Sequence, residues 1–309
     1  MNLLKLQGIL PVLPTPFNDN GSIDTEAMGR VAQFCVDAGA SGLVFPGVAS
    51  EYDHLFTDEQ SELLDVVCRV AENRIPVICG GGKGEPEVIA ENILFAKSKG
   101  VVAAMVLIPN RFAGDEAGAL SFILSVIEKS PGMDIILQNA PAPVGAGLDS
   151  DALKRIVNAT TAIRYVKEEA LPSGPRISAL LEGAPEHLIG VIGGGGARYL
   201  IDEMNRGAIG AMPAAEITDL HVRMWNAFQN GNVEQARDLY MKTLPLLIIQ
   251  LIYRMRLTKH VLTRRGLFTN SIVRAPLPDF DAYDEAELNA QMDSLAGLFE
   301  IASLKAVEV

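Results

Sequence analysis

The chain has 309 residues, of which 49% are hydrophobic and 21% charged, so it can bury a large core and wholesale disorder is excluded. Its formal net charge of −12 argues against binding nucleic acid or an anionic membrane surface through a general positive field. The length suits one large α/β domain or two ordinary ones.

The cysteines, the N-terminal residues and the apolar runs indicate in which cellular compartment the protein resides. The three cysteines, Cys35, Cys68 and Cys79, follow no metal-ligand spacing and form no even set for a disulfide framework, so we interpret them as buried thiols in a reducing compartment. Residues 1–17 lack the pattern of a signal peptide. Apolar runs such as 101–109 are too short to span a bilayer. These features predict a cytoplasmic protein without a membrane partner.

Short apolar runs alternate with amphipathic stretches through the first two thirds of the chain. Residues on both faces of these runs are apolar, as in a parallel sheet that helices cover. Eight such strand–helix units predict an α/β fold, the (β/α)8 or TIM barrel. A doubly wound sheet is disfavoured because no glycine-rich phosphate turn follows the first run. The runs lie at 8–13, 41–45, 76–80, 102–108, 134–138, 163–167, 188–193 and 208–212.

The amphipathic stretches are typical of helices, and Asp24 and Thr57 are expected to cap the first two of them. After residue 214 the pattern is helical only, with stretches at 216–231, 232–266 and 284–305. We therefore assign residues 1–229 to the barrel and residues 230–309 to a C-terminal helical extension. The Leu/Ile-rich faces of the extension must pack on the barrel or on another subunit.

Lys167 stands where a buried strand should end, in the segment AIRYVKEEA. It is expected to be the last residue of the sixth strand, and strand alternation puts Ile163, Tyr165 and Lys167 on one face. Barrel active sites lie at the carboxyl ends of the strands, so an inward lysine would stand at the mouth. Burial favours the neutral amine, which can attack a carbonyl and form a Schiff base. The alternative is a lysine paired with Glu168 or Glu169 on a solvated loop.

Several segments resemble the dihydrodipicolinate synthase / N-acetylneuraminate lyase family of class I (Schiff-base) aldolases. The segment VKEEA matches the segment of the imine-forming lysine, IILQNAPAPVGAGL matches the fifth strand, and GVASEYDHLF is similar to the Gly-x-x-Gly-Glu loop. The resemblance covers residues 8 to about 275. It implies a lyase without metal or cofactor, a small 2-keto acid as substrate, Lys167 as the Schiff-base residue, and a homotetramer.

The sequence departs from the family pattern at several functional positions. Val48 and Ala49 stand where classical members have two hydroxyl residues, and Ser50 stands at the second glycine. Gln138 replaces a tyrosine that shuttles protons, and an amide does not titrate. Pro143 replaces an arginine that binds a second carboxylate in the synthases. Synthase activity is therefore disfavoured.

One branch of the family, which contains 2-keto-3-deoxy-L-arabonate dehydratases, also lacks the tyrosine and has a similar Gln-x-Ala-Pro segment. We therefore predict a Schiff-base dehydratase of a 2-keto-3-deoxy sugar acid. The loop residues Val48, Ala49 and Ser50 are expected to bind the substrate carboxylate through backbone N–H groups and the Ser50 hydroxyl. Gln138 is expected to orient a substrate hydroxyl or a water.

Three other features of the sequence each allow two functional interpretations. Four glycines at 193–196 follow the seventh strand, and the resemblance places them over the distal hydroxyls, where Gly193 and Gly194 leave room for a polyhydroxy chain. A phosphate cradle is the alternative. Tyr165 is expected to fill the barrel interior rather than assist Lys167. Glu51 acts either in acid/base work or as an anchor for its loop.

The four histidines are scattered without ligand spacing, so we expect no metal site. Two further functions stay open. The first is a pyruvate-dependent aldolase or lyase of the same family, similar to N-acetylneuraminate lyase or dihydrodipicolinate synthase. The second is a barrel that has lost catalysis and serves as a ligand sensor. Borohydride trapping on Lys167 would distinguish the enzymes from the sensor.

Overall fold

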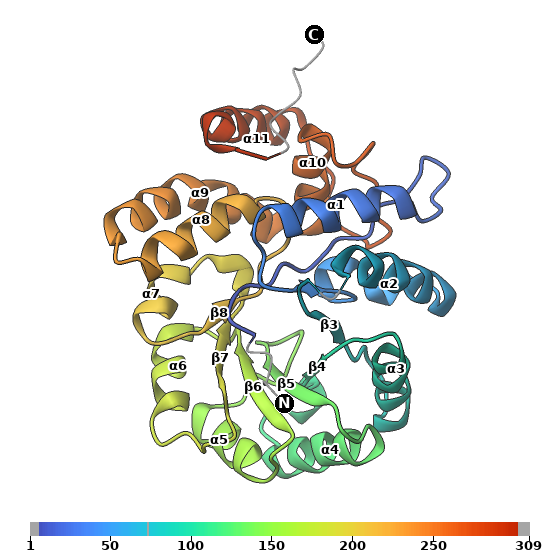
Figure 1. The fold of residues 1–309 in the computed structure, drawn as a ribbon, viewed down its shortest axis with the longest axis vertical. Helices are drawn as coiled ribbons and strands as arrows, with labels where there is room; N and C mark the ends of the chain where they lie inside the picture. The colour runs from blue at the N-terminus through green and yellow to red at the C-terminus, as the bar shows by residue number, and fades with distance from the viewer. Residues whose placement is uncertain (1–5, 73, 302–309) are drawn as a thin grey trace.

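The computed structural model describes residues 6–72 and 74–301 (Figure 1). The expectation that residues 1–17 form no signal peptide lies outside them where it concerns residues 1–5. Eight parallel strands form one sheet in the order β1-β8-β7-β6-β5-β4-β3-β2. An isolated parallel bridge between Val12 and Val44 joins the ends of this order, so the sheet closes into the predicted barrel. The strands are β1 (Gly8–Ile9), β2 (Leu43–Val44), β3 (Val77–Gly80), β4 (Ala103–Leu107), β5 (Asp134–Asn139), β6 (Ile163–Glu168), β7 (Gly190–Gly193) and β8 (Gly210–Ala211).

Helices alternate with the strands and surround the sheet (Figure 1). Asp24 caps α1 as predicted, because its carboxylate accepts from the Ala27 N–H at 2.9 Å. The prediction for Thr57 is wrong by one residue, since Phe56 occupies the cap position of α2. The helices are α1 (Thr25–Asp37), α2 (Thr57–Ala71), α3 (Pro86–Ser98), α4 (Glu116–Lys129), α5 (Ser150–Asn158), α6 (Ser173–Leu181), α7 (Leu200–Asn205) and α8 (Thr218–Gln229).

Three helices follow the barrel: α9 (Val233–Tyr253), α10 (Met255–Arg264) and α11 (Ala282–Leu295). The single stretch predicted at 232–266 is therefore two helices with a break at Arg254. The stretch predicted at 284–305 is helical only to Leu298, and its last residues lie outside the described part of the chain. An apolar cluster joins α8, α9, α10 and α11, which explains why the Leu/Ile-rich faces stay together.

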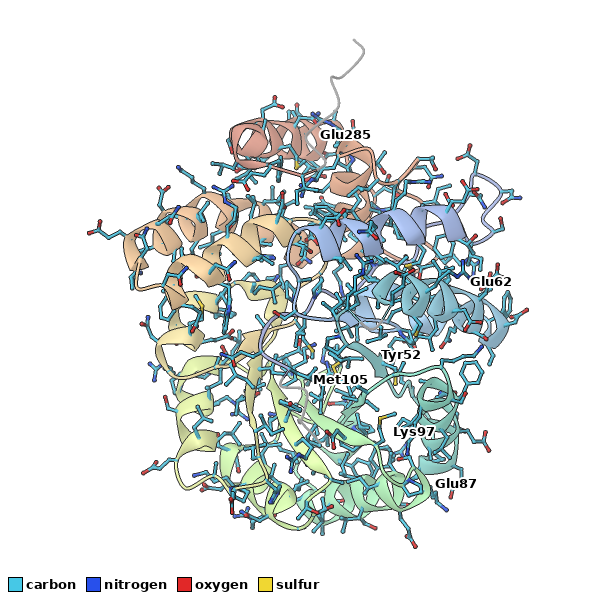
Figure 2. The ribbon with its side chains drawn as sticks, viewed as in Figure 1. Tyr52, Glu62, Glu87, Lys97, Met105 and Glu285 are labelled. Atoms are coloured by element: carbon cyan, nitrogen blue, oxygen red, sulfur yellow. The ribbon has the colours of Figure 1, made fainter. Side chains whose placement is uncertain are left out.

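Apolar side chains fill both sides of the sheet. Met105 lies inside the barrel, whereas Glu87 extends outward from α3 (Figure 2). Tyr165 belongs to the inner cluster, and its hydroxyl accepts from the Leu6 N–H at 3.2 Å, so it fills the interior as predicted. Ile163 belongs to the outer cluster, contrary to the predicted alternation. The register between β5 and β6 shifts one residue after Ile163, and this irregularity reverses the face.

Three expectations concern the cysteines, membrane-spanning helices and metal sites. All three cysteines are free thiols, and burial raises the pKa of Cys35 and Cys79 to about 12. Cys68 is only partly buried, so the prediction of a buried thiol holds for the other two. None of the helices in the described ranges is long and apolar enough to cross a membrane. Among the same residues, no group of three His, Cys, Asp or Glu side chains is placed to hold a metal ion.

Candidate active site

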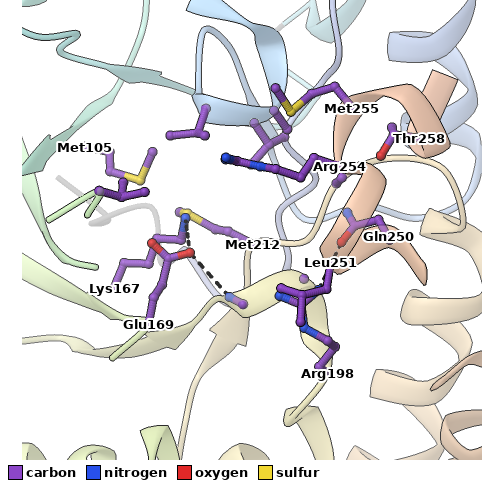
Figure 3. A pocket seen from close by; sticks show the side chains of 17 residues that line it. Met105, Lys167, Glu169, Arg198, Met212, Gln250, Leu251, Arg254, Met255 and Thr258 are labelled. Atoms are coloured by element: carbon purple, nitrogen blue, oxygen red, sulfur yellow. Dashed lines mark hydrogen bonds and ion pairs between the residues drawn. The ribbon is translucent and has the colours of Figure 1, made fainter. Parts of the chain in front are cut away.

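A cavity of about 300 Å³ lies at the carboxyl ends of the strands, bordered by the helices α9 and α10 (Figure 3). A side cavity of about 260 Å³ shares Lys167 and Glu169 with it and adds Gln138. Substrates of TIM-barrel enzymes bind at this end of the barrel. The lining of the main cavity includes Val12, Val48, Ala49, Met105, Lys167, Glu169, Met212, Gln250, Leu251, Arg254, Met255 and Thr258.

Lys167 lies one residue before the end of β6, so its predicted place as the last strand residue was off by one. The residue is only 4% exposed, and its side chain nevertheless lines both cavities. The direction follows from alternation over the last residues of the strand, because Tyr165 faces the barrel interior below it. The structure therefore brings the amine to the mouth of the barrel.

Glu169 is the acidic partner of this amine. Its Oε1 lies 3.2 Å from Lys167 Nζ and also accepts from the Gly195 N–H at 3.3 Å. Its Oε2 accepts from Gln138 Nε2 at 2.6 Å. Burial raises the pKa of Glu169, but the charge of Lys167 and the hydrogen bonds outweigh it and leave the pKa below its ordinary value. The open alternative was half right: Lys167 pairs with Glu169, but the pair is buried in a cavity rather than on a solvated loop.

Glu168 has a different environment from its neighbour. Its carboxylate accepts from Asn139 Nδ2 at 3.0 Å and from the Ala170 N–H at 2.7 Å, and it forms an ion pair with Arg176 at 3.3 Å. Burial nevertheless raises the pKa of Glu168. These contacts tie the end of β6 to β5 and α6, so Glu168 supports the strand that carries Lys167.

The residues predicted to bind the substrate carboxylate lie in the loop after β2. Two of them line the cavity, and the third is buried in the protein. Val48 and Ala49 line the cavity. Ser50 is fully buried, and its hydroxyl donates to the Leu13 carbonyl at 2.5 Å. Its backbone N–H donates to the Gly47 carbonyl at 2.9 Å. Both donors of Ser50 are thus used within the protein, and they hold this loop against the end of the first strand.

Glu51 anchors the same loop. Its Oε1 lies 2.5 Å from Lys259 Nζ, and its Oε2 accepts from the N–H groups of Arg274 and Ala275 at 2.8 and 2.7 Å. Its backbone is left-handed, with φ 57°. The Glu51 carboxylate is buried and bound to Lys259 of α10 and to the backbone N–H groups of residues 274 and 275. The geometry therefore favours the anchoring role for Glu51 over acid/base work.

The glycines after β7 make room for protein groups. A Cβ at Gly194 would overlap Glu169 Cγ, and a Cβ at Gly193 would overlap the carboxylate of Glu203. Neither of these glycines lines the main cavity, where Gly195 and Gly196 lie instead. Gly194 therefore matters to the site because it lets Glu169 approach Lys167.

Several cavity residues were not foreseen from the sequence. Arg198 follows β7, and Gln250, Arg254 and Thr258 come from the helical extension. The last three lie far from Lys167 along the chain, in a stretch whose pattern predicts only helices. The break at Arg254 carries no glycine or proline, so no sequence signal marked it.

The model of the Dihydrodipicolinate synthetase family matches residues 5–295. An L-2-keto-3-deoxyarabonate dehydratase of Azospirillum brasilense is 28% identical over 288 residues, which cover 92% of this chain and 93% of that relative. A 4-hydroxy-tetrahydrodipicolinate synthase of Maridesulfovibrio salexigens is 26% identical over 290 residues, which cover 94% and 98% of the two chains.

The fold has close counterparts among solved structures. The crystal structure of a dihydrodipicolinate synthase from Rhodopseudomonas palustris matches with a TM-score of 0.88 at 23% identity, covering 94% of this chain and 97% of that one. This likeness concerns the barrel and its helices. The family match extends over nearly the whole chain and includes both halves of the cavity lining. The chain therefore belongs to the dihydrodipicolinate synthetase family and is an enzyme of the lyase class.

Proposed function

We propose that this enzyme dehydrates a 2-keto-3-deoxy sugar acid through a Schiff base on Lys167, with Glu169 as the proton carrier. The observation that carries the proposal is the buried Lys167–Glu169 pair, whose two charged atoms lie 3.2 Å apart on the wall of a cavity. A carboxylate at that distance is within reach of the amine proton. The pair thus contains both groups that imine chemistry requires.

The first stage forms the imine. Glu169 takes a proton from the Lys167 ammonium, and the free amine attacks C2 of the keto acid to give a carbinolamine. The carbinolamine hydroxyl then leaves as water with the proton that Glu169 holds. The products are an iminium on Lys167, a water molecule and the regenerated Glu169 carboxylate. The lowered pKa keeps Glu169 ionised beside the Lys167 ammonium, and the carboxylate gains basicity as the amine attacks C2 and the positive charge that lowers its pKa is lost.

The second stage eliminates water from the substrate. The iminium draws electrons from C3, so Glu169 can remove a C3 proton and leave an enamine. The enamine electrons expel the C4 hydroxyl, which departs as water with the same proton. Hydrolysis of the resulting conjugated iminium frees Lys167. Gln138 holds the other oxygen of Glu169 at 2.6 Å, and because an amide does not titrate, its role is to orient the carboxylate.

The remaining predicted residues take smaller roles in this proposal. Val48 and Ala49 lie at the carboxylate end of the substrate, next to the cavity. Ser50 keeps their loop in place through its bond to Leu13. Gly193 and Gly194 provide the space that Glu203 and Glu169 occupy.

The dehydratase relative supports elimination of water, whereas the synthase relatives support the second candidate, a pyruvate-dependent aldol reaction. The two reactions share the Lys167 imine and differ in the bond that breaks. Gln138 and Pro143 stand where the synthases have a tyrosine and an arginine, and this difference favours dehydration. Product analysis separates them, because only carbon–carbon cleavage releases pyruvate and an aldehyde.

Borohydride reduction in the presence of a 2-keto acid tests the proposal. We expect a stable mass adduct on Lys167 in the parent protein and none in Lys167→Ala. Lys83→Ala, which removes an exposed lysine paired with Asp53, is the matched control and should still give the adduct. Absence of an adduct in the parent would favour the ligand-sensor alternative. A panel of 2-keto-3-deoxy acids, assayed for substrate loss and for pyruvate, then identifies the reaction.

A further inference from the structure

Two arginine side chains reach the cavity without forming an ion pair, and Arg254 is the more exposed. It lies between α9 and α10, and its guanidinium extends from the helices over the cavity on the side of Lys167 (Figure 3). Arg254 lines the main cavity, the side cavity and a third cavity of about 320 Å³ beside the loop after β2. Within residues 6–72 and 74–301, no hydrogen bond or ion pair reaches its guanidinium.

The backbone of Arg254 is in a conformation that favours glycine. Its φ is 48° and its ψ is −122°, a region in which a Cβ crowds the adjacent peptide groups. The flanking helices hold it there: its N–H donates to the Gln250 carbonyl at 2.7 Å, and its carbonyl accepts from the Thr258 N–H at 3.2 Å. Strained non-glycine residues cluster at ligand sites, so this conformation points to a function for the side chain.

Arg198 is the second cation. Its Nη1 donates to Gln250 Oε1 at 3.0 Å and to the Leu247 carbonyl at 3.4 Å, and both acceptors are uncharged. Burial lowers the pKa of Arg198, as expected for a partly desolvated guanidinium. Lys167 and Glu169 neutralise each other in the same cavity. The two arginines therefore give the cavity lining an excess of positive charge in a chain whose net charge is −12, although the buried carboxyl of Glu216, which does not line the cavity, also attracts Arg198.

The different exposure of Lys167, Arg198 and Arg254 indicates which part of a bound substrate each side chain would contact. Lys167 is 4% exposed and extends from a barrel strand, whereas Arg254 is exposed and Arg198 is half-buried. A keto acid joined to Lys167 through C2 would have its far end nearest the arginines. We propose that the substrate carries a second anionic group at the end opposite the ketone, bound by Arg254 with Arg198 beside it. This inference rests on the proposed Schiff-base function and narrows its substrate class to dianionic 2-keto acids.

Two five-carbon acids that differ only in the distal group test the proposal. The concentration that gives half-maximal borohydride trapping on Lys167 is measured for 2-oxoglutarate and for 2-oxopentanoate. We expect 2-oxoglutarate to need a concentration lower by about tenfold to a hundredfold, the range for a charge-assisted hydrogen bond. Arg254→Gly should remove this preference by raising the concentration that 2-oxoglutarate needs. A parallel pair, 2-keto-3-deoxygluconate and its 6-phosphate, tells whether the distal anion is a carboxylate or a phosphate.

Arg254→Gly is a suitable variant because glycine adopts the observed backbone conformation without strain. We expect its thermal midpoint to rise while the preference for dianions disappears, which separates loss of function from loss of fold. Arg237→Ala removes an exposed arginine of α9 and should keep the full preference.

Three results would overturn the inference. One is equal trapping of the mono- and dianionic acids in the parent. Another is a preference that survives Arg254→Gly. The third is an equal loss for both acids in Arg254→Gly, which would place the guanidinium at the shared C1 carboxylate. Absence of any adduct in the parent is a different failure, because it refutes the Schiff-base function itself and this inference with it.

Discussion

Within the described residues, 6–72 and 74–301, two buried lysine–glutamate pairs differ in what surrounds them. The Lys167–Glu169 pair lies on the wall of the cavity with its charged atoms 3.2 Å apart. The Lys259–Glu51 pair is sealed between α10 and the loop after β2, with its charged atoms 2.5 Å apart. The side chains of the first pair are 6% and 18% exposed, and those of the second are 1% and 0% exposed.

In the sealed Lys259–Glu51 pair, both side chains have further partners within the protein. Lys259 Nζ also donates to the Ile272 carbonyl at 2.7 Å and lies 4.2 Å from the centre of the Phe17 ring. Glu51 accepts from two backbone N–H groups at 274 and 275. In the cavity pair, the partners of Glu169 leave the Lys167 amine open to a ligand. The same two residue types therefore anchor a loop in one place and, in our proposal, provide a nucleophile in the other.

The largest expected effect comes from exchanging the two lysines for methionine and measuring adduct formation. Lys167→Met should lose the borohydride adduct entirely and remain folded. Lys259→Met should still form the adduct under conditions in which it is folded. Mass spectrometry of the reduced proteins, with circular dichroism as the folding control, checks both expectations. An adduct on Lys167→Met would assign the imine to another lysine.

Glu169→Gln should have the next largest effect, a fall in the catalytic rate. It retains the size of the side chain and one acceptor oxygen for Lys167 and the Gly195 N–H, but it removes the titrating group and puts an NH2 group opposite the Gln138 amide. We expect kcat to fall by about 10²–10⁴, the usual contribution of a general base, with a smaller change in KM. Glu168→Gln is the matched control, because it should change stability more than rate. Steady-state kinetics decides, and an unaltered kcat in Glu169→Gln would place the base elsewhere.

Lys259→Met should also be strongly destabilising, because it leaves the Glu51 carboxylate buried without its cation. Breaking one partner of a buried pair costs about 3–5 kcal/mol of unfolding free energy. The double variant Lys259→Met/Glu51→Gln should recover part of the loss, since no buried charge remains. Urea unfolding of the parent, single and double variants measures this. A double variant no more stable than the single one would contradict the account.

Local sequence patterns predict the barrel and Lys167 but not the contacts between distant segments. The eight-strand rhythm predicted the barrel because each strand is apolar on both faces and each unit packs locally. Lys167 was singled out because a cation at the end of such a strand is unusual, and the family resemblance, rather than the position alone, favoured a catalytic role over a solvated ion pair. Glu51 and Glu169 remained open, since both are loop glutamates after a strand and only the fold brings Lys259 to one and Lys167 to the other.

Other errors and omissions have local physical causes. Ile163 faces the helices because the register shifts between β5 and β6, and alternation alone does not reveal such a shift. Arg254 was missed because it lies within a continuous helical pattern and has no breaker beside it. The catalytic roles of the site residues, the division at residue 229 and the homotetramer remain predictions.

The smallest effect that we expect is a change with pH in the stability that Lys259 contributes. Burial lowers the pKa of Lys259 from 10.5 to about 8, although Glu51 opposes the shift. Between these pH values the unfolded chain binds a proton that the folded protein has released, so the contribution of Lys259 to stability rises with pH across this window. We expect the difference in unfolding free energy between the parent and Lys259→Met to grow by on the order of 2 kcal/mol from about pH 7.5 to about pH 10. The raised thiol pKa values of Cys35 and Cys79 act in the opposite direction, but they are common to both proteins and cancel in the difference. A flat difference would mean that the sealed amine remains charged throughout, and the contrast with the cavity pair would then depend on access alone.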